Sequence, residues 1–165
     1  MKVIKFKEIN STNEYAKTAY QELDNNTVII AKHQTAGKGR LGRTWLDKDA
    51  NSALFTILIK DHLNTSNISN LTLLMATSVL KVLNNITPGF SIKWPNDIYY
   101  QDKKVVGILT ESKINNNNVE YVIIGVGINV NQNEFDDSLN AISVRQITNQ
   151  KTDIDTLIIK IATTF

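Results

Sequence analysis

The sequence predicts an α+β domain in which a mixed, largely antiparallel sheet is flanked by helices. Helix-like and strand-like segments follow one another in irregular order, which excludes a regular βαβ array. The segment 52–60 (SALFTILIK) is apolar enough for a central strand. From Pro88 onward, strand patterns are separated by tight turns, as neighbouring antiparallel strands are.

The first part of the chain predicts a strand, a helix and a second strand. Residues 2–7 (KVIKFK) alternate apolar and polar side chains, which is typical of a half-buried strand. Ser11 followed by Glu14 is a capping-box pattern, so a helix is expected to begin there and to end at Asp24-Asn25-Asn26. Residues 27–32 (TVIIAK) predict a strand, and residues 34–46 predict a polar, glycine-rich loop.

The rest of the chain predicts two helices and five strands. A helix over 66–84 is expected to be capped by Ser66 or Asn67 and to turn inward Ile68, Leu71, Leu74, Met75, Val79, Val82 and Leu83. Strands are expected at 52–60, 90–94, 97–101, 104–114 and 119–130, with a hairpin turn at Asn115–Asn118 and an amphipathic helix over 153–165. Because no linker or repeat interrupts this pattern, a single domain over residues 1–165 is expected.

The composition excludes several classes of protein. The 165 residues are 42% hydrophobic and 21% charged, as in one folded domain. The chain has no cysteine, which excludes disulfides and thiolate chemistry, and its two histidines argue against a histidine zinc site. The formal net charge of +2 is too small to indicate nucleic-acid binding. No membrane span or signal peptide is recognised, so a cytoplasmic protein is expected.

The segment HQTAGKGRLGRTW, from His33 to Trp45, gathers residue types that are rare elsewhere in the chain. It holds two of the three arginines and three of the seven glycines. Glycine lets the backbone approach a ligand, and successive N–H groups can cup an anion that Lys38, Arg40 and Arg43 would neutralise. Trp45 offers a flat face for stacking. The segment is neither a Walker A loop nor a GxGxxG turn. It predicts an anion-binding loop, the alternative being a flexible basic surface loop.

The segment IKWPNDIYYQDKKVVGILTES, from Ile92 to Ser112, carries a second candidate cation. Lys93 stands at a strand end beside Trp94, where its ammonium could reach a carboxylate or phosphate. The alternative is a solvated lysine before a Pro-Asn-Asp turn. Asp97 is interpreted as shaping that turn rather than as holding magnesium. Gly107 interrupts a strand, which indicates that another group approaches closely there.

Two further segments carry weaker signals. In IIGVGINVN, Gly125 and Gly127 fall on the same face of a strand and leave room for a flat ligand, while Asn129 can present a donor and an acceptor to an adenine edge. The alternative is a glycine-rich bulge. The segment Ser11-Thr12-Asn13 has helix capping as its ordinary role, although its side chains could also bind a small polar ligand.

Taken together and in this order, STN, QTAGKGRLGRTW, KWPND, GILTE and GVGIN resemble the biotin protein ligases, over roughly residues 1–165. The resemblance implies a core similar to that of class II aminoacyl-tRNA synthetases. It also implies the family's activity, which is to make biotinyl-5′-adenylate from biotin and ATP with Mg²⁺ and to transfer biotin to one lysine of a biotin carboxyl carrier protein. The carrier is expected to be of the acetyl-CoA carboxylase or pyruvate carboxylase type. Many relatives dimerise, so a homodimer is one option, but the sequence does not give the oligomeric state.

The resemblance also implies which residues form the site. The catalytic residues would be Lys93 and Arg40. The biotin-binding residues would be Ser11, Thr12, Asn13, Gln34, Gly37, Lys38, Gly39, Arg40, Lys93, Gly107 and Gly125. The ATP-binding residues would be Arg40, Arg43, Trp45, Lys93 and Asn129. No protein ligand to a metal is expected, because magnesium would arrive with ATP.

The sequence departs from the family pattern in the loop and at its two ends. The family loop is commonly GRGRRGR, whereas Lys38 and Leu41 stand at two of those arginine positions here. The chain begins about ten residues before STN, so neither an N-terminal winged helix nor DNA binding is expected. It stops inside the last helix, so the small C-terminal SH3-like barrel of many relatives is not expected either.

Three alternatives remain open at this point. A lipoate or octanoate ligase would use the same adenylate chemistry, but the RRxSGGG-type segment of those relatives is missing here. A biotin-binding module impaired in transfer would account for the altered loop. A basic nucleic-acid module would rest on the loop charges alone.

Overall fold

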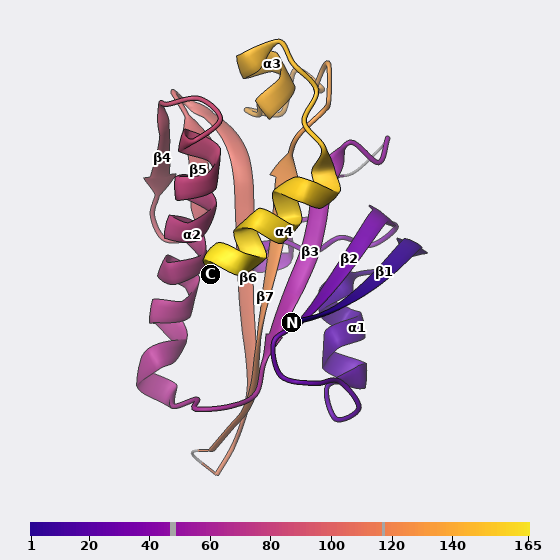
Figure 1. Cartoon of the computed structure of the whole chain (residues 1–165), viewed down its shortest axis with the longest axis vertical. Helices are drawn as coiled ribbons and strands as arrows, with labels where there is room; N and C mark the ends of the chain where they lie inside the picture. The colour runs from indigo at the N-terminus through magenta and orange to yellow at the C-terminus, as the bar shows by residue number, and fades with distance from the viewer. Residues whose placement is uncertain (47–48, 117) are drawn as a thin grey trace.

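The computed structural model describes residues 1–46, 49–116 and 118–165 and is built on one seven-stranded sheet (Figure 1). The strands lie in the order β1-β2-β3-β7-β6-β5-β4. Their bounds are β1 Lys2–Ile9, β2 Thr27–Gln34, β3 Ser52–Ile59, β4 Phe90–Lys93, β5 Asp97–Tyr100, β6 Lys103–Asn115 and β7 Asn118–Asn129. Only the β1–β2 pair is parallel among the described strands. The predicted α+β class with a mixed sheet is therefore confirmed.

Helices α2 (Ile68–Asn84) and α4 (Ile154–Thr164) cover one face of the sheet (Figure 1). The larger part of the core lies between these helices and alternate residues of the central strands. Successive side chains of a strand point to opposite faces of the sheet, so every second one faces the helices. Its fully buried large side chains include Phe55, Met75, Leu83, Ile124 and Ile158. Since this face is filled with apolar side chains, it leaves the opposite face for a site.

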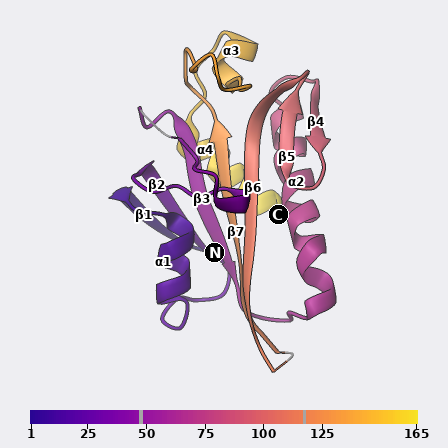
Figure 2. The same cartoon turned by 180° about the vertical axis from the view of Figure 1, so that it is seen from behind.

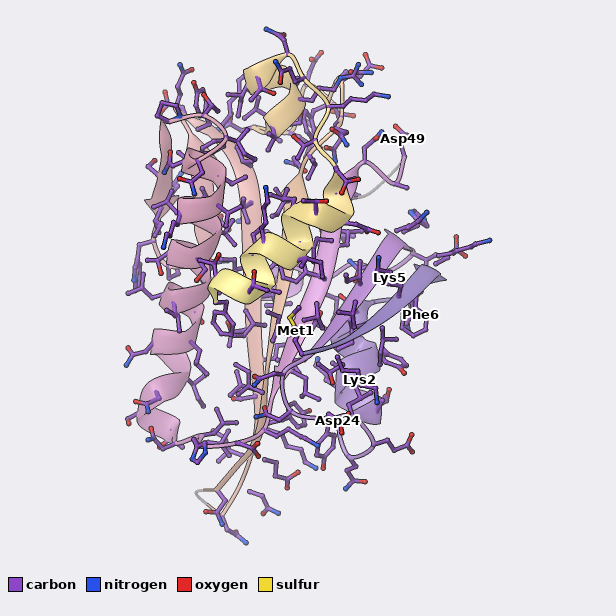
Figure 3. All side chains as sticks on the ribbon, viewed as in Figure 1. Met1, Lys2, Lys5, Phe6, Asp24 and Asp49 are labelled. Atoms are coloured by element: carbon purple, nitrogen blue, oxygen red, sulfur yellow. The ribbon has the colours of Figure 1, made fainter. Side chains whose placement is uncertain are left out.

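Helix α1 (Thr12–Ala19) and the glycine-rich loop lie on the opposite face (Figure 2). Around α1 a smaller apolar cluster is formed by Ala16, Leu23, Ile29, Leu58, Tyr121 and Ile123. Strand β1 joins both sides of the sheet, as its labelled side chains in Figure 3 illustrate. Phe6 packs edge-on against Tyr15, with ring centroids 4.8 Å apart, whereas the neighbouring Lys5 pairs with Asp155 of α4 at 2.7 Å.

Helix α2 differs from its prediction at two places. Leu74 was expected to face inward, but it is 47% exposed, while Ala76 and Ser78 are buried instead. The helix is preceded by a 3₁₀ turn, η2 (Thr65–Asn67), whose cap is the side chain of Asn64 rather than that of Ser66 or Asn67. Asn67 is the N-cap residue of α2 by position, as predicted, but its side chain makes no capping hydrogen bond. The other six residues expected to face inward are buried or packed against the core, so the phase of the helix is as predicted.

The capping box predicted at Ser11 is only half formed. Ser11 accepts from the backbone N–H of Glu14, but the Glu14 carboxylate turns away to bind two lysines. The structure has a complete capping box elsewhere, at Ser143 and Gln146, where it begins the unpredicted short helix α3 (Val144–Thr148). Strands β6 and β7 pair antiparallel up to Asn115 and Asn118, and Asn117 of the expected hairpin turn lies outside the described residues.

No helix among the described residues is long and apolar enough to cross a membrane.

Candidate active site

The sheet register gathers the candidate residues on the face that carries α1. Lys93, Asp97, Gly107, Gly127 and Leu54 are consecutive partners across five neighbouring strands. Because directly paired residues point to the same face of a sheet, this row faces the loop. Residues two further along each strand, including Gly125 and Thr56, extend the same face toward α1.

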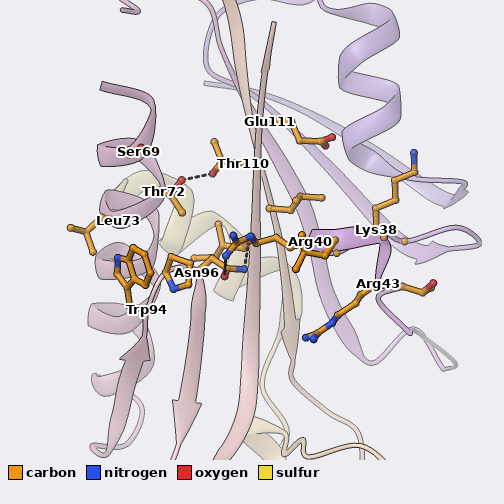
Figure 4. A pocket seen from close by; sticks show the side chains of 18 of the residues that line it. Lys38, Arg40, Arg43, Ser69, Thr72, Leu73, Trp94, Asn96, Thr110 and Glu111 are labelled. Atoms are coloured by element: carbon orange, nitrogen blue, oxygen red, sulfur yellow. Dashed lines mark hydrogen bonds between the residues drawn. The ribbon is translucent and has the colours of Figure 1, made fainter. Parts of the chain in front are cut away.

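A cavity of about 940 Å³ opens where β6 loses a neighbour. Strand β5 pairs with β6 only as far as Gly107, and Asn96 then closes the gap by exchanging two 2.9 Å hydrogen bonds with the backbone of Ile108. Beyond that point, β6 from Ile108 to Glu111 borders the cavity. Figure 4 shows the loop side chains Lys38, Arg40 and Arg43 on one side of it and Ser69, Thr72 and Leu73 of α2 on the other.

The glycine-rich loop is a small hairpin that lies across the sheet. Lys38 and Thr44 form an antiparallel bridge, Gly39 N–H donates to the carbonyl of Arg43 at 2.7 Å, and the loop turns through η1 (Arg40–Gly42). Arg40 donates to the side-chain oxygen of Asn96 at 2.9 Å, as the dashed line in Figure 4 marks. The loop is thereby attached to the turn between β4 and β5.

A second cavity of about 60 Å³ lies beneath this hairpin and has a polar end. There, the Oε1 atom of Gln34 accepts from both the backbone N–H and the hydroxyl of Thr12, at 2.7 and 3.0 Å. Since these two bonds use both lone pairs of the amide oxygen, the nitrogen end of Gln34 is left as the donor. The hydroxyl of Thr12, which donates to Gln34, lies 2.8 Å from the hydroxyl of Thr56.

Glu111 orients Asn13 at the floor of the same cavity. The carboxylate of Glu111 accepts from the Asn13 side-chain nitrogen at 2.9 Å and from Lys17 at 2.6 Å. Because an ionised carboxylate only accepts, the nitrogen of the Asn13 amide must face it, and the amide oxygen then accepts from the hydroxyl of Thr56 at 2.6 Å. This buried chain gives the polar end a defined pattern of donors and acceptors.

Three glycines make room for side chains that cross the sheet. A Cβ on Gly125 would collide with the Asn13 amide. Cβ atoms on Gly107 and Gly127 would stand 2.9 and 2.6 Å from the indole of Trp45. The close approach predicted at Gly107 is therefore present. The flat group above Gly107 and Gly127 is the protein's own indole, whose Nε1 is buried with no hydrogen-bond partner among the described residues.

Two lysines at the loop and the sheet floor form ion pairs with carboxylates. Lys38 binds Glu14 at 2.9 Å, and Lys104 binds Asp97 at 2.9 Å. Hydrogen bonds from Lys17 and then from Lys38 hold the pKa of the Glu14 carboxyl below its ordinary value of 4.5. The side chain of Asp97 is thus engaged in the turn and its ion pair, which agrees with its interpretation as a structural residue.

Most of the predicted site residues line the two cavities. The smaller cavity is lined by Ser11, Thr12, Asn13, Gln34, Lys38, Gly39, Arg40, Trp45, Gly107 and Gly125, and the larger one adds Gly37 and Arg43. Lys93 and Asn129 line neither. The Nζ atom of Lys93 lies 4.3 Å from the ring centroid of Tyr99, and Asn129 donates to the backbone carbonyl of Lys104 at 3.3 Å. Their roles stay predictions.

Sequence reasoning did not assign several residues that build the site. Asn96 and Glu111 stand inside the motifs KWPND and GILTE, so motif membership was an available signal for both. Thr56 and Lys104 carry no local signal, because only the pairing of distant strands brings Lys104 to the smaller cavity and Thr56 to the side chain of Asn13.

Comparisons with known proteins agree with this geometry. The model of the biotin/lipoate A/B protein ligase family matches residues 5–129. The chain is 39% identical over 146 residues to the bifunctional ligase/repressor BirA of Bacillus subtilis, an alignment that covers 83% of this chain and 45% of that protein. It is 32% identical over 124 residues to the biotin–[acetyl-CoA-carboxylase] ligase of Paracoccus denitrificans, covering 73% of this chain and 51% of that one.

The solved structure of the biotin protein ligase from Aquifex aeolicus in complex with biotin and ATP has the same fold. It superposes with a TM-score of 0.84 at 36% identity, over 99% of this chain and 68% of that one. The chain belongs to the biotin/lipoate A/B protein ligase family. Within it, the similarity is to biotin protein ligases, as the motifs predicted, although the chain spans only about half the length of the curated relatives it matches.

Replacing Gly127 by alanine should move the Trp45 indole away from the sheet. The new Cβ would stand 2.6 Å from the ring, so the ring must shift toward solvent. In a Trp94→Phe background, where Trp45 is the remaining tryptophan, we expect the emission of Gly127→Ala to shift to the red. Gly39→Ala is the control, because its Cβ would meet its nearest neighbour at 3.4 Å. Identical spectra for the two variants would contradict the packing.

The carboxylate of Glu14 should contribute to stability in a pH-dependent way. Because its pKa is lowered on folding, the contribution is present above 4.5 and is lost as the pH falls through the folded-state value. We expect Glu14→Gln to lower the free energy of unfolding by up to about 1 kcal/mol at pH 7, since Lys38 is exposed. Urea denaturation at pH 7 and at pH 3 measures the difference, with Glu22→Gln as the control. A loss that persists unchanged at pH 3 would refute the ion-pair origin.

Proposed function

We propose that this chain activates biotin with ATP to biotinyl-5′-AMP and then transfers biotin to a lysine of a biotin carboxyl carrier protein. The observation that supports this most directly is the convergence on one sheet face of a polar pocket end and a loop of cations. Family membership points the same way, as does the relative from Aquifex aeolicus, which is in complex with biotin and ATP.

The smaller cavity is the proposed biotin site. Its polar end, formed by Thr12, Asn13 and Gln34, presents neutral donors and acceptors suited to a ureido ring, with Ser11 beside it. Gly107 and Gly125 line the floor, and the loop from Gly37 to Arg43 forms the cover. At about 60 Å³ this cavity must widen to admit a bicyclic ligand, so we propose that the loop and Trp45 move outward on binding.

The loop cations are proposed to act in the first step. A biotin carboxylate oxygen attacks the α-phosphorus of ATP, a new O–P bond forms, and pyrophosphate leaves. Carboxylate and phosphate repel each other, and Arg40, Lys38 and Lys93 would offset that repulsion and stabilise the charge of the transition state. In the second step the amine of the carrier lysine attacks the activated carbonyl and AMP leaves, so that the enzyme need not supply a nucleophile.

ATP is proposed to bind toward Arg43 and the indole of Trp45, with Lys93 at the phosphates and Asn129 at the adenine edge. Within the described residues, no cluster of three or more histidine, aspartate or glutamate side chains could hold a metal ion. We therefore propose that magnesium enters on the ATP phosphates, where it offsets the charge of the leaving pyrophosphate.

The carrier is proposed to belong to a carboxylase of the acetyl-CoA or pyruvate type, in line with the name of the Paracoccus denitrificans relative. A homodimer, the lack of DNA and membrane partners and a cytoplasmic location stay predictions from the sequence.

Mass spectrometry of the small molecules retained after incubation with MgATP and either biotin or lipoate tests the proposal. We expect biotinyl-adenylate to be retained. Lipoyl-adenylate in its place would assign the chain to the lipoate branch of the family. Biotin retained without adenylate would indicate a binding module that does not turn over.

Arg40→Ala should lower the rate of biotin-dependent pyrophosphate release by about 10²–10³, the loss typical of one oriented transition-state contact. Arg145→Ala, which removes the arginine of the distant helix α3, is the matched control and should leave the rate unchanged. Lys93→Ala is expected to act like Arg40→Ala. If Lys93→Ala retains the full rate, Lys93 has no part in the mechanism. Its ammonium would then serve only to pack over the ring of Tyr99.

A further inference from the structure

Three large apolar side chains are exposed around the 940 Å³ cavity, and we call Leu41, Leu73 and Trp94 the apolar rim. Their exposed fractions are 91%, 50% and 84%. They come from the loop, from the beginning of α2 and from the turn after β4, and Figure 4 shows Leu73 and Trp94 next to each other. Apolar groups gathered at the mouth of a polar site are typical of a surface that contacts another protein.

The backbone at Leu41 strengthens this interpretation. Its φ of 56° and ψ of 37° lie in the left-handed region, which disfavours a residue with a Cβ atom. The strain is not offset by burial, because the side chain is the most exposed of the large apolar residues. Holding Leu41 in solvent in this conformation does not stabilise the isolated chain. Backbone strain of this kind is concentrated at binding sites.

The proposed transfer step requires a protein to contact this mouth. The acceptor lysine must reach the activated carbonyl inside the cavity, and its ammonium stands on only a four-carbon stem. The surface that surrounds the lysine must therefore come to the edge of the cavity, where the apolar rim lies. Small substrates such as biotin and ATP place no such demand on side chains that point into solvent.

The charges around the cavity indicate the chemistry of the partner. Among its described lining residues, Arg40 and Arg43 are cationic, whereas Lys38 is paired with Glu14 and Glu111 with Lys17. The mouth is therefore positive beside the apolar rim, which favours a partner surface that is acidic around an apolar patch.

We propose that the apolar rim is the docking surface for the acceptor domain, a folded protein that presents its target lysine among apolar side chains on an acidic surface. This inference rests on the proposed function, because it assigns the partner of the same site.

Leu73→Ser tests the docking surface, with Leu74→Ser as the matched control. The two leucines are neighbours on α2 and are similarly exposed, at 50% and 47%, but only Leu73 lines the cavity. Three rates are measured: pyrophosphate release with biotin and MgATP, reaction of the adenylate with hydroxylamine, and transfer to the apo carrier domain of an acetyl-CoA carboxylase. Hydroxylamine needs no docking, so it reports the chemistry alone.

We expect Leu73→Ser to lower kcat/KM for carrier transfer by about tenfold, the loss typical of an interface anchor, and to leave the other two rates unchanged. Leu74→Ser should leave all three unchanged. Added salt should slow carrier transfer but not the hydroxylamine reaction, because the partner is acidic. Equal transfer rates for the two variants, or an equal loss with hydroxylamine and carrier, would overturn the inference. Failure of the unmodified chain to form adenylate would instead overturn the proposed function.

Discussion

The bare backbone at Gly107, Gly125 and Gly127 is the constraint on which the rest of the site depends. Helices α2 and α4 cover the other face of the sheet, so the sheet can bind a ligand only on the face that carries α1 and the loop. On that face, any side chain at these three positions would strike the Asn13 amide or the Trp45 indole. The loop hairpin, the polar pocket end and the indole can lie against the sheet because the central strands carry no side chains at these three glycines.

The polar interactions around these glycines have two parts, one at the pocket end and one leading to the loop, and Glu111 belongs to both. Glu111 orients Asn13, whose amide oxygen accepts from the hydroxyl of Thr56, and that hydroxyl lies next to the side chain of Thr12. Lys17 and Glu14 continue the chain of charges to Lys38 in the loop. The residues that would recognise the ligand and the residues that would cover it are thus joined through one ionic network. Hydrogen bonds and ion pairs of α1 residues thus connect the loop with the pocket end.

The altered loop acquires an explanation from its surroundings. Lys38 lacks the planar fork of arginine, but a compact ammonium suits the single carboxylate of Glu14 that receives it. Leu41 brings no charge, and it lies exposed at the rim of the cavity in a left-handed conformation. Lys38 and Leu41 weaken a purely electrostatic interpretation of the loop. Both are consistent with a loop that also contacts another protein.

The sequence by itself determined the class of fold, the strands, the principal helices and a part of the cavity lining, because periodicity, turn residues and rare residue types act locally. It also contained the motifs that place the chain in its family. Only the tertiary structure decided that Leu74 faces solvent, that Trp45 covers Gly107 and Gly127, that Thr56 bonds Asn13 and that Leu73 lines the larger cavity. Each of these depends on strand register or helix phase across the sheet, and no local pattern encodes a contact between residues so far apart in the chain.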